Sequence, residues 1–393
     1  MKNRKSFLKG ALCGALAMLL VAGLVSCGLK VNNGNSDITS KTEDKISELQ
    51  NLIEKHYMGD VKEKNLEDGV YKGYINGLND PYSVYYNKKE TKELYESTGG
   101  EYSGIGAVMS QNTETGVITL VQIYKDSPAE KAGLKENDIL YKVEGKEVTG
   151  KDLSKVVSKV KGEKGTTVEL TVLRGEDAKE VTVTATRDTV QAQTIEYKMM
   201  DDKIGYIRVS EFDTVTYDQY KEALDDLEKQ GMTGLVVDLR NNPGGSLSTV
   251  CDMLDLMLPK GLIVYTEDKY GNREEETCDG KNKLDMPLAV LVNENSASAS
   301  EIFAGAVQDH GVGTIVGTTT YGKGVVQELR QLSDGSAVKL TVSNYYTPNG
   351  NSINKVGIKP DVEVKLASVL LNKDEITHEE DNQLQKALNV IEN

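Results

Sequence analysis

The feature that most constrains the fold of this chain is a run of alternating apolar and amphipathic segments that begins near residue 203. Nearly continuous apolar stretches at 235–239, 288–292 and 314–316 are separated by segments with helical spacing. Uninterrupted apolar strands joined by helices are typical of a mostly parallel sheet that is covered on both faces. The sequence therefore predicts an α/β domain, whose active site is expected beyond the carboxyl ends of these strands.

The segment that follows residue 292 has three serines that alternate with alanines, where a helix is predicted to begin. Small side chains let a substrate approach the backbone, and the free N–H groups of a helix N-terminus suit a developing oxyanion. The middle serine, Ser298, is therefore a candidate nucleophile. The alternative is that Ser298 and Glu301 form a capping box and take no part in chemistry.

The segment after residue 316 holds Lys323 between two glycines, with Val325 and Val326 close behind. Burial among such neighbours would lower the pKa of the ammonium from about 10.4 and make a neutral amine available as a general base. The alternative is a solvated loop lysine. A nucleotide-binding P-loop is rejected, because Gly324 replaces the magnesium-binding hydroxyl and the next residues predict a strand instead of a helix.

The segment after residue 239 contains a glycine pair, Gly244 and Gly245. Paired glycines leave backbone N–H groups unobstructed, so this turn can supply a second oxyanion donor beside the N–H of Ala299. The alternative is an ordinary strand-to-helix turn. His310 ends the helix that Ser298 begins, roughly 15–18 Å away at 1.5 Å per residue, which leaves a lysine as the remaining candidate base.

The composition argues against two other kinds of site. The three histidines lie far apart without ligand spacing, so no metal site is expected. The formal net charge of −15 repels phosphate backbones, so nucleic acid is not expected as a partner. Cys251 and Cys278 could pair in an oxidising compartment, but two cysteines define no disulfide framework.

The N-terminus predicts where the protein resides. A basic start precedes an apolar run from Ala11 to Val25, which suits a signal-peptide core better than a relaxed bilayer span. The next residues resemble the lipobox of bacterial lipoproteins, in which Cys27 would become the lipidated first residue. The alternative is an uncleaved membrane anchor. Both interpretations predict an extracytoplasmic protein attached to the bacterial cell membrane.

The rest of the chain divides by composition and periodicity. After the leader at 1–27, residues 28–44 are polar and predict a flexible tether, and residues 45–98 carry apolar positions at helical spacing. Residues 99–187 contain short β-rich runs separated by glycine turns, which predict a compact β-rich module. The α/β domain is expected over 188–372, with a C-terminal tail at 373–393.

Three motifs together resemble the carboxyl-terminal processing peptidases, the tail-specific serine peptidases of family S41. They are residues 238–245, residues 296–302, and residues 321–324 with Gln327. In that family the nucleophile is the middle serine of the alternation and a lysine base follows 25 residues later, as Lys323 follows Ser298. The resemblance implies that Gln327 orients the lysine. It also implies a Clp-protease/crotonase-like core that needs no metal and no cofactor.

The β-rich module resembles a PDZ domain. Residues 127–134, followed by residues 137–140, are similar to a signature of that fold. The loop that holds Gly104, Ile105 and Gly106 resembles its carboxylate-binding loop, where backbone N–H groups capture a chain terminus. Within that family resemblance, the helical region ahead of the module is expected to serve a homodimer.

Together these observations predict a serine endopeptidase with an α/β core, an inserted PDZ domain and a small N-terminal helical unit. It would dock a protein or peptide C-terminus and cleave upstream of it. Ser298 would attack, Lys323 would take its proton, and Gln327 would orient Lys323. Two alternatives remain: a module that binds C-termini without cutting, and a crotonase-like acyl-CoA enzyme, which suits neither export nor a PDZ domain.

Overall fold

The computed structural model describes residues 37–175, 177–370, 373 and 376–392. The predicted leader, its lipidation residue Cys27 and the first part of the predicted tether lie outside the described residues. The chain divides into two compact units, with the boundary between Leu66 and Glu67. Within the described ranges, no helix is both long and apolar enough to cross a membrane.

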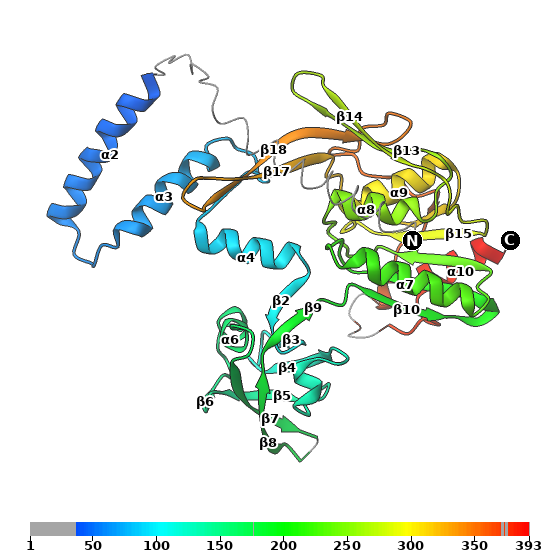
Figure 1. The fold of residues 1–393 in the computed structure, drawn as a ribbon, viewed down its shortest axis with the longest axis horizontal. Helices are drawn as coiled ribbons and strands as arrows, with labels where there is room; N and C mark the ends of the chain where they lie inside the picture. Colours follow the sequence, from blue (N-terminus) through cyan, green and yellow to red (C-terminus); the bar gives the residue numbers. More distant parts are fainter. Residues whose placement is uncertain (1–36, 176, 371–372, 374–375, 393) are drawn as a thin grey trace, which may run out of the picture. The chain divides into compact units, whose positions relative to one another are not determined.

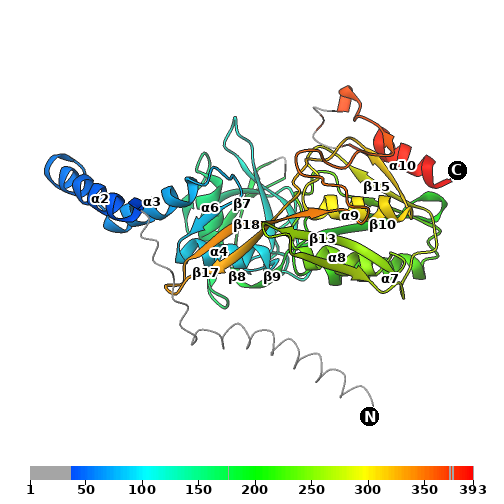
Figure 2. The same cartoon turned by 90° about the horizontal axis from the view of Figure 1, so that it is seen from above.

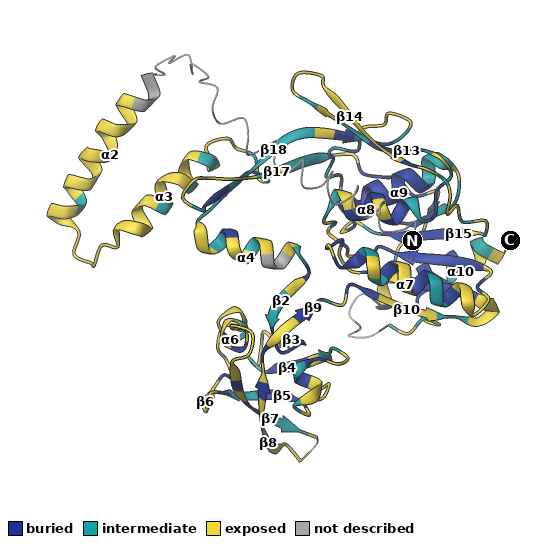
Figure 3. Cartoon of the chain, viewed as in Figure 1, coloured by how far each residue is buried: buried dark blue, intermediate teal, exposed yellow. Residues whose placement is uncertain are grey.

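The described part of the first unit, from residue 37, is mostly helical. Helix α2 (Asp37–His56) begins inside the range predicted as a tether, because no Gly or Pro interrupts the chain between its bounds. Its apolar residues Ile46, Leu49 and Leu52 are exposed, and most of the helix is coloured accordingly in Figure 3. Helix α3 (Glu63–Asn76) starts in this unit.

The core of the second unit is the predicted parallel sheet. It has six strands in the order β10-β11-β12-β15-β16-β19, of which β10 is an antiparallel edge and the other neighbours are parallel. The strands are β10 (Ile195–Met199), β11 (Ile204–Val209), β12 (Gly234–Asp238), β15 (Leu288–Val292), β16 (Thr314–Gly317) and β19 (Val362–Glu363). All residues of β12 and β15 are buried, which is the reason why β15 is continuously apolar and β12 is apolar up to Asp238.

Helices cover both faces of this sheet (Figures 1 and 2). They are α7 (Thr216–Lys229), α8 (Leu247–Asp255), α9 (Ala299–His310) and α10 (Asn382–Glu392). Val237 and Val290 pack with α7, α8 and α9 in one core, whereas Val236 and Ala289 pack with α10 in the other. Helix α10 lies in the range predicted as a C-terminal tail, and its Leu384 is fully buried.

A second, antiparallel sheet has the order β1-β18-β13-β14, with β17 also paired to β18. Its strands are β1 (Val84–Tyr86), β13 (Gly261–Asp268), β14 (Arg273–Cys278), β17 (Val325–Gln331) and β18 (Ala337–Tyr346). Strand β1 precedes the β-rich module in sequence and pairs with β18, which follows it. The module is therefore inserted into the α/β domain.

The inserted module has its own hydrophobic core. Its elements are β3 (Ala107–Gln111), β4 (Ile118–Ile123), α5 (Pro128–Lys131), β5 (Ile139–Val143), β6 (Lys146–Glu147), α6 (Leu153–Val160), β7 (Thr167–Arg174) and β8 (Lys179–Thr186). Helix α4 (Lys88–Thr98) leads toward it, and the two connections, β2 (Glu101–Gly104) and β9 (Asp188–Gln191), pair with each other. Short 3-10 turns at Asp201–Lys203 and Ser368–Leu370 complete the described elements.

Candidate active site

The loops that leave β12, β15 and β16 meet at one end of the parallel sheet. Asn242 is fully buried, and its carbonyl accepts the Ala297 N–H and the Ser300 hydroxyl, each at 3.0 Å. The Tyr321 N–H donates to the Ser296 carbonyl at 3.0 Å. These bonds join the first loop to the second and the second to the third, so the three sequence motifs belong to one site.

Ser298 stands at the start of α9 with φ 56° and ψ −113°. A left-handed φ is costly for a residue with a side chain, and such strain concentrates at functional sites. The next residue, Ala299, is buried, and its N–H donates to no partner among the described residues. An unengaged N–H at this position suits a developing oxyanion.

The predicted glycine pair packs against Ser298. A Cβ on Gly244 would lie 2.8 Å from the Ser298 Cβ, and a Cβ on Gly245 would lie 2.3 Å from the Phe212 carbonyl oxygen. Both glycines also have positive φ, so no other residue fits there without strain. The Gly244 N–H donates to Asn242 Oδ1 at 2.8 Å. Of the two predicted donors, only Gly245 has an N–H without a partner in the described part of the chain.

Glu301 connects the backbone of the predicted nucleophile to that of the predicted base. One oxygen of its fully buried carboxylate accepts the N–H groups of Ser298 and Lys323, each at 2.9 Å. The other oxygen accepts the Gly322 N–H at 2.7 Å and the Thr320 hydroxyl at 2.6 Å. The Ser298 bond is the return half of the predicted capping box. The other three bonds were missed by sequence reasoning, which saw Glu301 only as a capping residue.

Tyr345 makes a second connection between the same two residues. Its hydroxyl lies against the carbonyl oxygens of Ser298, at 3.1 Å, and of Lys323. The side chain is almost completely buried, and this burial raises the pKa of Tyr345 well above its ordinary value. The hydroxyl therefore stays protonated and remains a donor at neutral pH.

The Lys323 side chain is half-buried, and burial lowers the pKa of its ammonium. The positive charge of Lys339 lowers this pKa further, while Glu301 opposes the shift. The direction is the one predicted for a lysine that acts as a base. Among the described residues, no hydrogen bond joins Lys323 Nζ to the Ser298 hydroxyl. Such bonds often tighten only when substrate is present.

Gln327 lies on β17, where the pairing with β18 shifts register between Val326 and Gln327. Its amide nitrogen donates to the Val325 carbonyl and the Thr341 hydroxyl, each at 3.3 Å. None of the hydrogen bonds that Gln327 makes within the described ranges reaches Lys323. The predicted orienting contact is therefore not formed in this structure.

The predicted carboxylate loop of the inserted module borders a small apolar cavity of about 240 Å³. The N–H groups of Ile105 and Gly106 have no partner in the described part of the chain. Gly106 has φ 76°, and a Cβ there would lie 2.5 Å from Ser127 Cβ, so the loop requires glycine at this position. Lys161 borders the same cavity, with Nζ 4.7 Å from the centroid of the Tyr102 ring.

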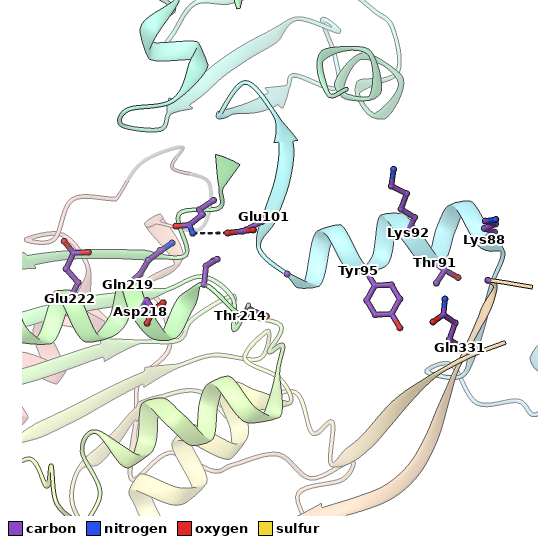
Figure 4. Close-up of a pocket in the computed structure, with 14 residues that line it drawn as sticks. Lys88, Thr91, Lys92, Tyr95, Glu101, Thr214, Asp218, Gln219, Glu222 and Gln331 are labelled. Carbon is purple, nitrogen blue, oxygen red and sulfur yellow. Dashed lines mark hydrogen bonds between the residues drawn. The ribbon is translucent and has the colours of Figure 1, made fainter. Parts of the chain in front are cut away.

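A larger cavity, of about 940 Å³, lies between α4, α7 and the β17–β18 hairpin (Figure 4). Its lining is of mixed charge, with Lys88 and Lys92 from α4 and Asp218 and Glu222 from α7. Neither Ser298 nor Lys323 lines it. It is therefore separate from the candidate chemistry.

Two further sequence questions concern metals and cysteines. The described residues contain no cluster of three or more His, Cys, Asp or Glu side chains that could hold a metal ion. Cys251 and Cys278 are both buried free thiols, and burial raises the pKa of Cys251 to about 12. These thiols are poor nucleophiles at neutral pH.

Comparisons with known proteins agree with this architecture. The model of peptidase family S41 matches residues 203–364, a PDZ domain model matches 119–174, and the model "Activating protease CtpB N-terminal domain" matches 26–91. The carboxy-terminal processing protease CtpA of Bacillus subtilis is 36% identical over 359 residues, which cover 89% of this chain and 76% of that protein. CtpB of the same organism is 37% identical over 329 residues, covering 83% and 68%. A solved photosystem II D1 C-terminal processing protease is 30% identical, with a TM-score of 0.48 over 78% of this chain and 84% of that one.

An α/β core of the S41 type with an inserted PDZ domain defines a serine peptidase, which is a hydrolase. The chain belongs to the carboxy-terminal processing proteases of peptidase family S41. The predicted family resemblance and fold class are thereby confirmed.

Proposed function

We propose that this protein is an extracytoplasmic endopeptidase that recognises polypeptide C-termini and cleaves by a Ser–Lys mechanism. Ser298 is the nucleophile and Lys323 is the general base. The observation that carries the proposal is the buried Glu301 carboxylate, which holds the backbone N–H groups of both residues at 2.9 Å. A structural cap would need only the first of these bonds.

In the first half of the reaction, the neutral amine of Lys323 takes the proton of the Ser298 hydroxyl while its oxygen bonds to the scissile carbonyl carbon. The oxyanion accepts the N–H groups of Ala299 and Gly245, which are unengaged in this structure. The C–N bond then breaks, and the ammonium of Lys323 returns the proton to the leaving amine. The same amine then takes a proton from water, whose oxygen bonds to the acyl carbon, and returns that proton to the Ser298 oxygen as the bond between the acyl carbon and Ser298 breaks.

The role of Gln327 requires a hydrogen bond to Lys323 that is not formed among the described residues. Its amide nitrogen donates to Val325 and Thr341, and its amide oxygen is the atom that would accept a hydrogen bond from the Lys323 amine. Both present bonds are 3.3 Å long, at the weak end of the range for N–H···O contacts. Releasing them therefore costs little.

Recognition of the C-terminus is assigned to the PDZ cavity. The free N–H groups of Ile105 and Gly106 would bind the terminal carboxylate, and Lys161 supplies a positive charge beside them. The apolar lining, which includes Val157 and Val160, suits a small apolar terminal side chain.

The extracytoplasmic location rests on the sequence of the leader and of the lipobox-like segment. Lipidation of Cys27 would anchor the protein to the membrane. If this is correct, Cys27→Ser will lose label from a radioactive fatty acid in cells. Retention of the label in that variant would contradict lipidation at this residue.

The proposal is tested with an unstructured reporter polypeptide that ends in small apolar residues. Ser298→Ala and Lys323→Ala are expected to abolish cleavage, and Lys359→Ala, at an exposed lysine, serves as the matched control. Amidation of the reporter C-terminus should slow cleavage sharply, and Lys161→Ala should reduce this dependence. If the Ser298 or Lys323 variant still cuts at the normal rate, the assigned residues are wrong. If the intact protein binds the reporter without cutting it, the binding-module alternative gains support.

A further inference from the structure

A segment that precedes the PDZ domain in sequence reaches the candidate active site. Strand β1 pairs antiparallel with β18, with Val84 opposite Lys339. Strand β18 also pairs with β17, which begins two residues after Lys323 and carries Gln327. The residues just before β1 are thereby brought beside the predicted base, although more than two hundred positions separate them in the chain.

The turn before β1 is fixed by side-chain hydrogen bonds. One oxygen of Asp80 accepts the Tyr82 N–H at 3.1 Å, and the other accepts the Ser83 hydroxyl at 2.6 Å. The buried Ser83 hydroxyl in turn accepts the Thr341 N–H of β18 at 3.1 Å. Thr341 is also the residue whose hydroxyl accepts the Gln327 amide. The turn is therefore tied to the same strand position as Gln327.

This turn places the Tyr82 ring over the amine of Lys323. The Nζ atom lies 5.1 Å from the ring centroid, within the range of about 6 Å in which a ring acts on a cation. The side chain of Tyr321, two residues before Lys323, lies near the Tyr82 hydroxyl. The ring is thus held at its backbone end by the Asp80 turn.

We propose that Tyr82 is a positioning residue of the catalytic site, whose ring forms the wall that shields the Lys323 amine from water and fixes its place. The inference rests on the proposed function, because it takes Lys323 as the base. It goes beyond that function by making the segment before the PDZ domain a part of the site.

The Tyr82 ring has two effects of opposite sign on the pKa of Lys323. Its bulk excludes water, which favours the neutral amine, and its π-face attracts the ammonium. Burial is the largest influence on this lysine and lowers its pKa, and the Tyr82 ring is one of the groups that bury the amine. The remaining charged or titratable groups near Lys323 are Lys339, which also lowers its pKa, Glu301, which raises it, and the hydroxyls of Tyr321 and Tyr345.

Three substitutions separate these effects. Tyr82→Ala opens the amine to water and is expected to move the Lys323 titration midpoint to higher pH by about one unit. Tyr82→Leu keeps an apolar wall without the π-face and should move the midpoint to lower pH by about half a unit. Tyr82→Phe keeps the ring and should leave the midpoint in place. Tyr270→Leu is the matched control, because the exposed Tyr270 ring covers Lys269 instead, at 5.0 Å.

The midpoint is measured on the full-length protein in two independent ways. Competitive acetylation with acetic anhydride, read by mass spectrometry of the Lys323 peptide, reports the amine directly and does not depend on cleavage. The acidic limb of the pH profile of kcat/KM reports the same group through activity. The Tyr270→Leu variant should leave both readouts for Lys323 unchanged.

The proposal is overturned if Tyr82→Ala retains its melting temperature and its Lys323 midpoint. If Tyr82→Ala does not fold, the Leu and Phe variants provide the test. The proposal is then overturned if the Lys323 midpoints of both variants equal that of the unmodified protein. If labelling midpoints shift as expected while even the unmodified protein cleaves nothing, the assignment of catalysis fails but the shielding role stands. If cleavage depends on Ser298 and Lys323 while no Tyr82 variant moves either midpoint, the catalytic assignment stands and the shielding role of Tyr82 fails.

Discussion

Replacing Glu301 with glutamine keeps the size of the side chain but turns one acceptor oxygen into a donor. The least costly orientation leaves the amide oxygen facing the N–H groups of Ser298 and Lys323 and turns the nitrogen toward Thr320 and Gly322. The Thr320 hydroxyl, which already accepts the Ile358 N–H at 2.7 Å, can rotate and use its second acceptor position for that nitrogen. The Gly322 N–H cannot adapt, because it now faces another donor in place of its 2.7 Å bond to the carboxylate.

The size of the effect follows from these bonds. A hydrogen bond to a charged group contributes about 1.5–3 kcal/mol, and a buried donor without a partner costs about 1–3 kcal/mol. These two contributions overlap at Gly322, so Glu301→Gln is expected to lower the free energy of unfolding by about 2–4 kcal/mol. In a domain of this size that corresponds to a fall of about 4–16 °C in melting temperature. Because the backbone of Ser298 and Lys323 is held less firmly, kcat should fall about tenfold as well.

The assay is thermal unfolding at neutral pH, followed by cleavage of the reporter at a temperature where the variant is folded. Glu294→Gln is the matched control, since Glu294 is exposed on the same loop and its one hydrogen bond within the described ranges is from the Thr318 hydroxyl, at 3.0 Å. A Glu301→Gln protein that melts within about 1 °C of the unmodified protein would refute the argument. A stable Glu301→Gln protein with unchanged kcat would also refute the argument that Glu301 holds Ser298 and Lys323 in place for catalysis.

Three further predictions concern charge. Lys339→Met removes a positive charge that lowers the pKa of Lys323, so the acidic limb of kcat/KM should move to higher pH by roughly half a unit. Burial alone would raise the pKa of Asp381, but its 2.7 Å contact with Arg240 holds this pKa below the ordinary value. Asp381→Asn should therefore cost about 1–3 kcal/mol of stability at neutral pH. The cost, measured by urea unfolding, should become progressively smaller as acid protonates the native carboxylate. Burial raises the pKa of Asp213 to about 7, so its contribution to stability is present in acid and lost as pH rises from about 4 to about 7. Asp213→Asn should therefore raise the melting temperature by an amount that grows over this range and then stays constant, and a gain independent of pH would contradict the assigned titration.

The parts of the fold that follow a regular period were predictable. The continuous apolar run at 288–292 coincides with β15 (Leu288–Val292), because a strand buried on both faces cannot alternate with polar residues. Similarly, Gly244 and Gly245 have positive φ and no room for a Cβ. Because only glycine meets both conditions, the pair stands out in the sequence. Steric requirements of this kind leave a mark in the sequence itself.

Other parts of the site leave no such mark. The partners of Glu301 at Gly322 and Lys323 are backbone N–H groups, which every residue but proline possesses. Strand β1 is three residues long, too short for a periodic pattern. The side chain of Gln327 is directed to Thr341 beside a register shift that depends on pairing between two distant strands. These contacts are set by tertiary structure and could not have been inferred from local sequence.

The pairing of β2 with β9 has a mechanical consequence for the PDZ domain. A domain attached through one strand can swivel about its single bonds, whereas a paired ribbon resists torsion because rotation strains the ladder that joins its strands. Bending remains easier than twisting, so a captured polypeptide would be presented in a restricted set of directions. This restriction raises its effective concentration over that of a freely jointed tether. It also means that a single nick in either connection leaves the domain attached.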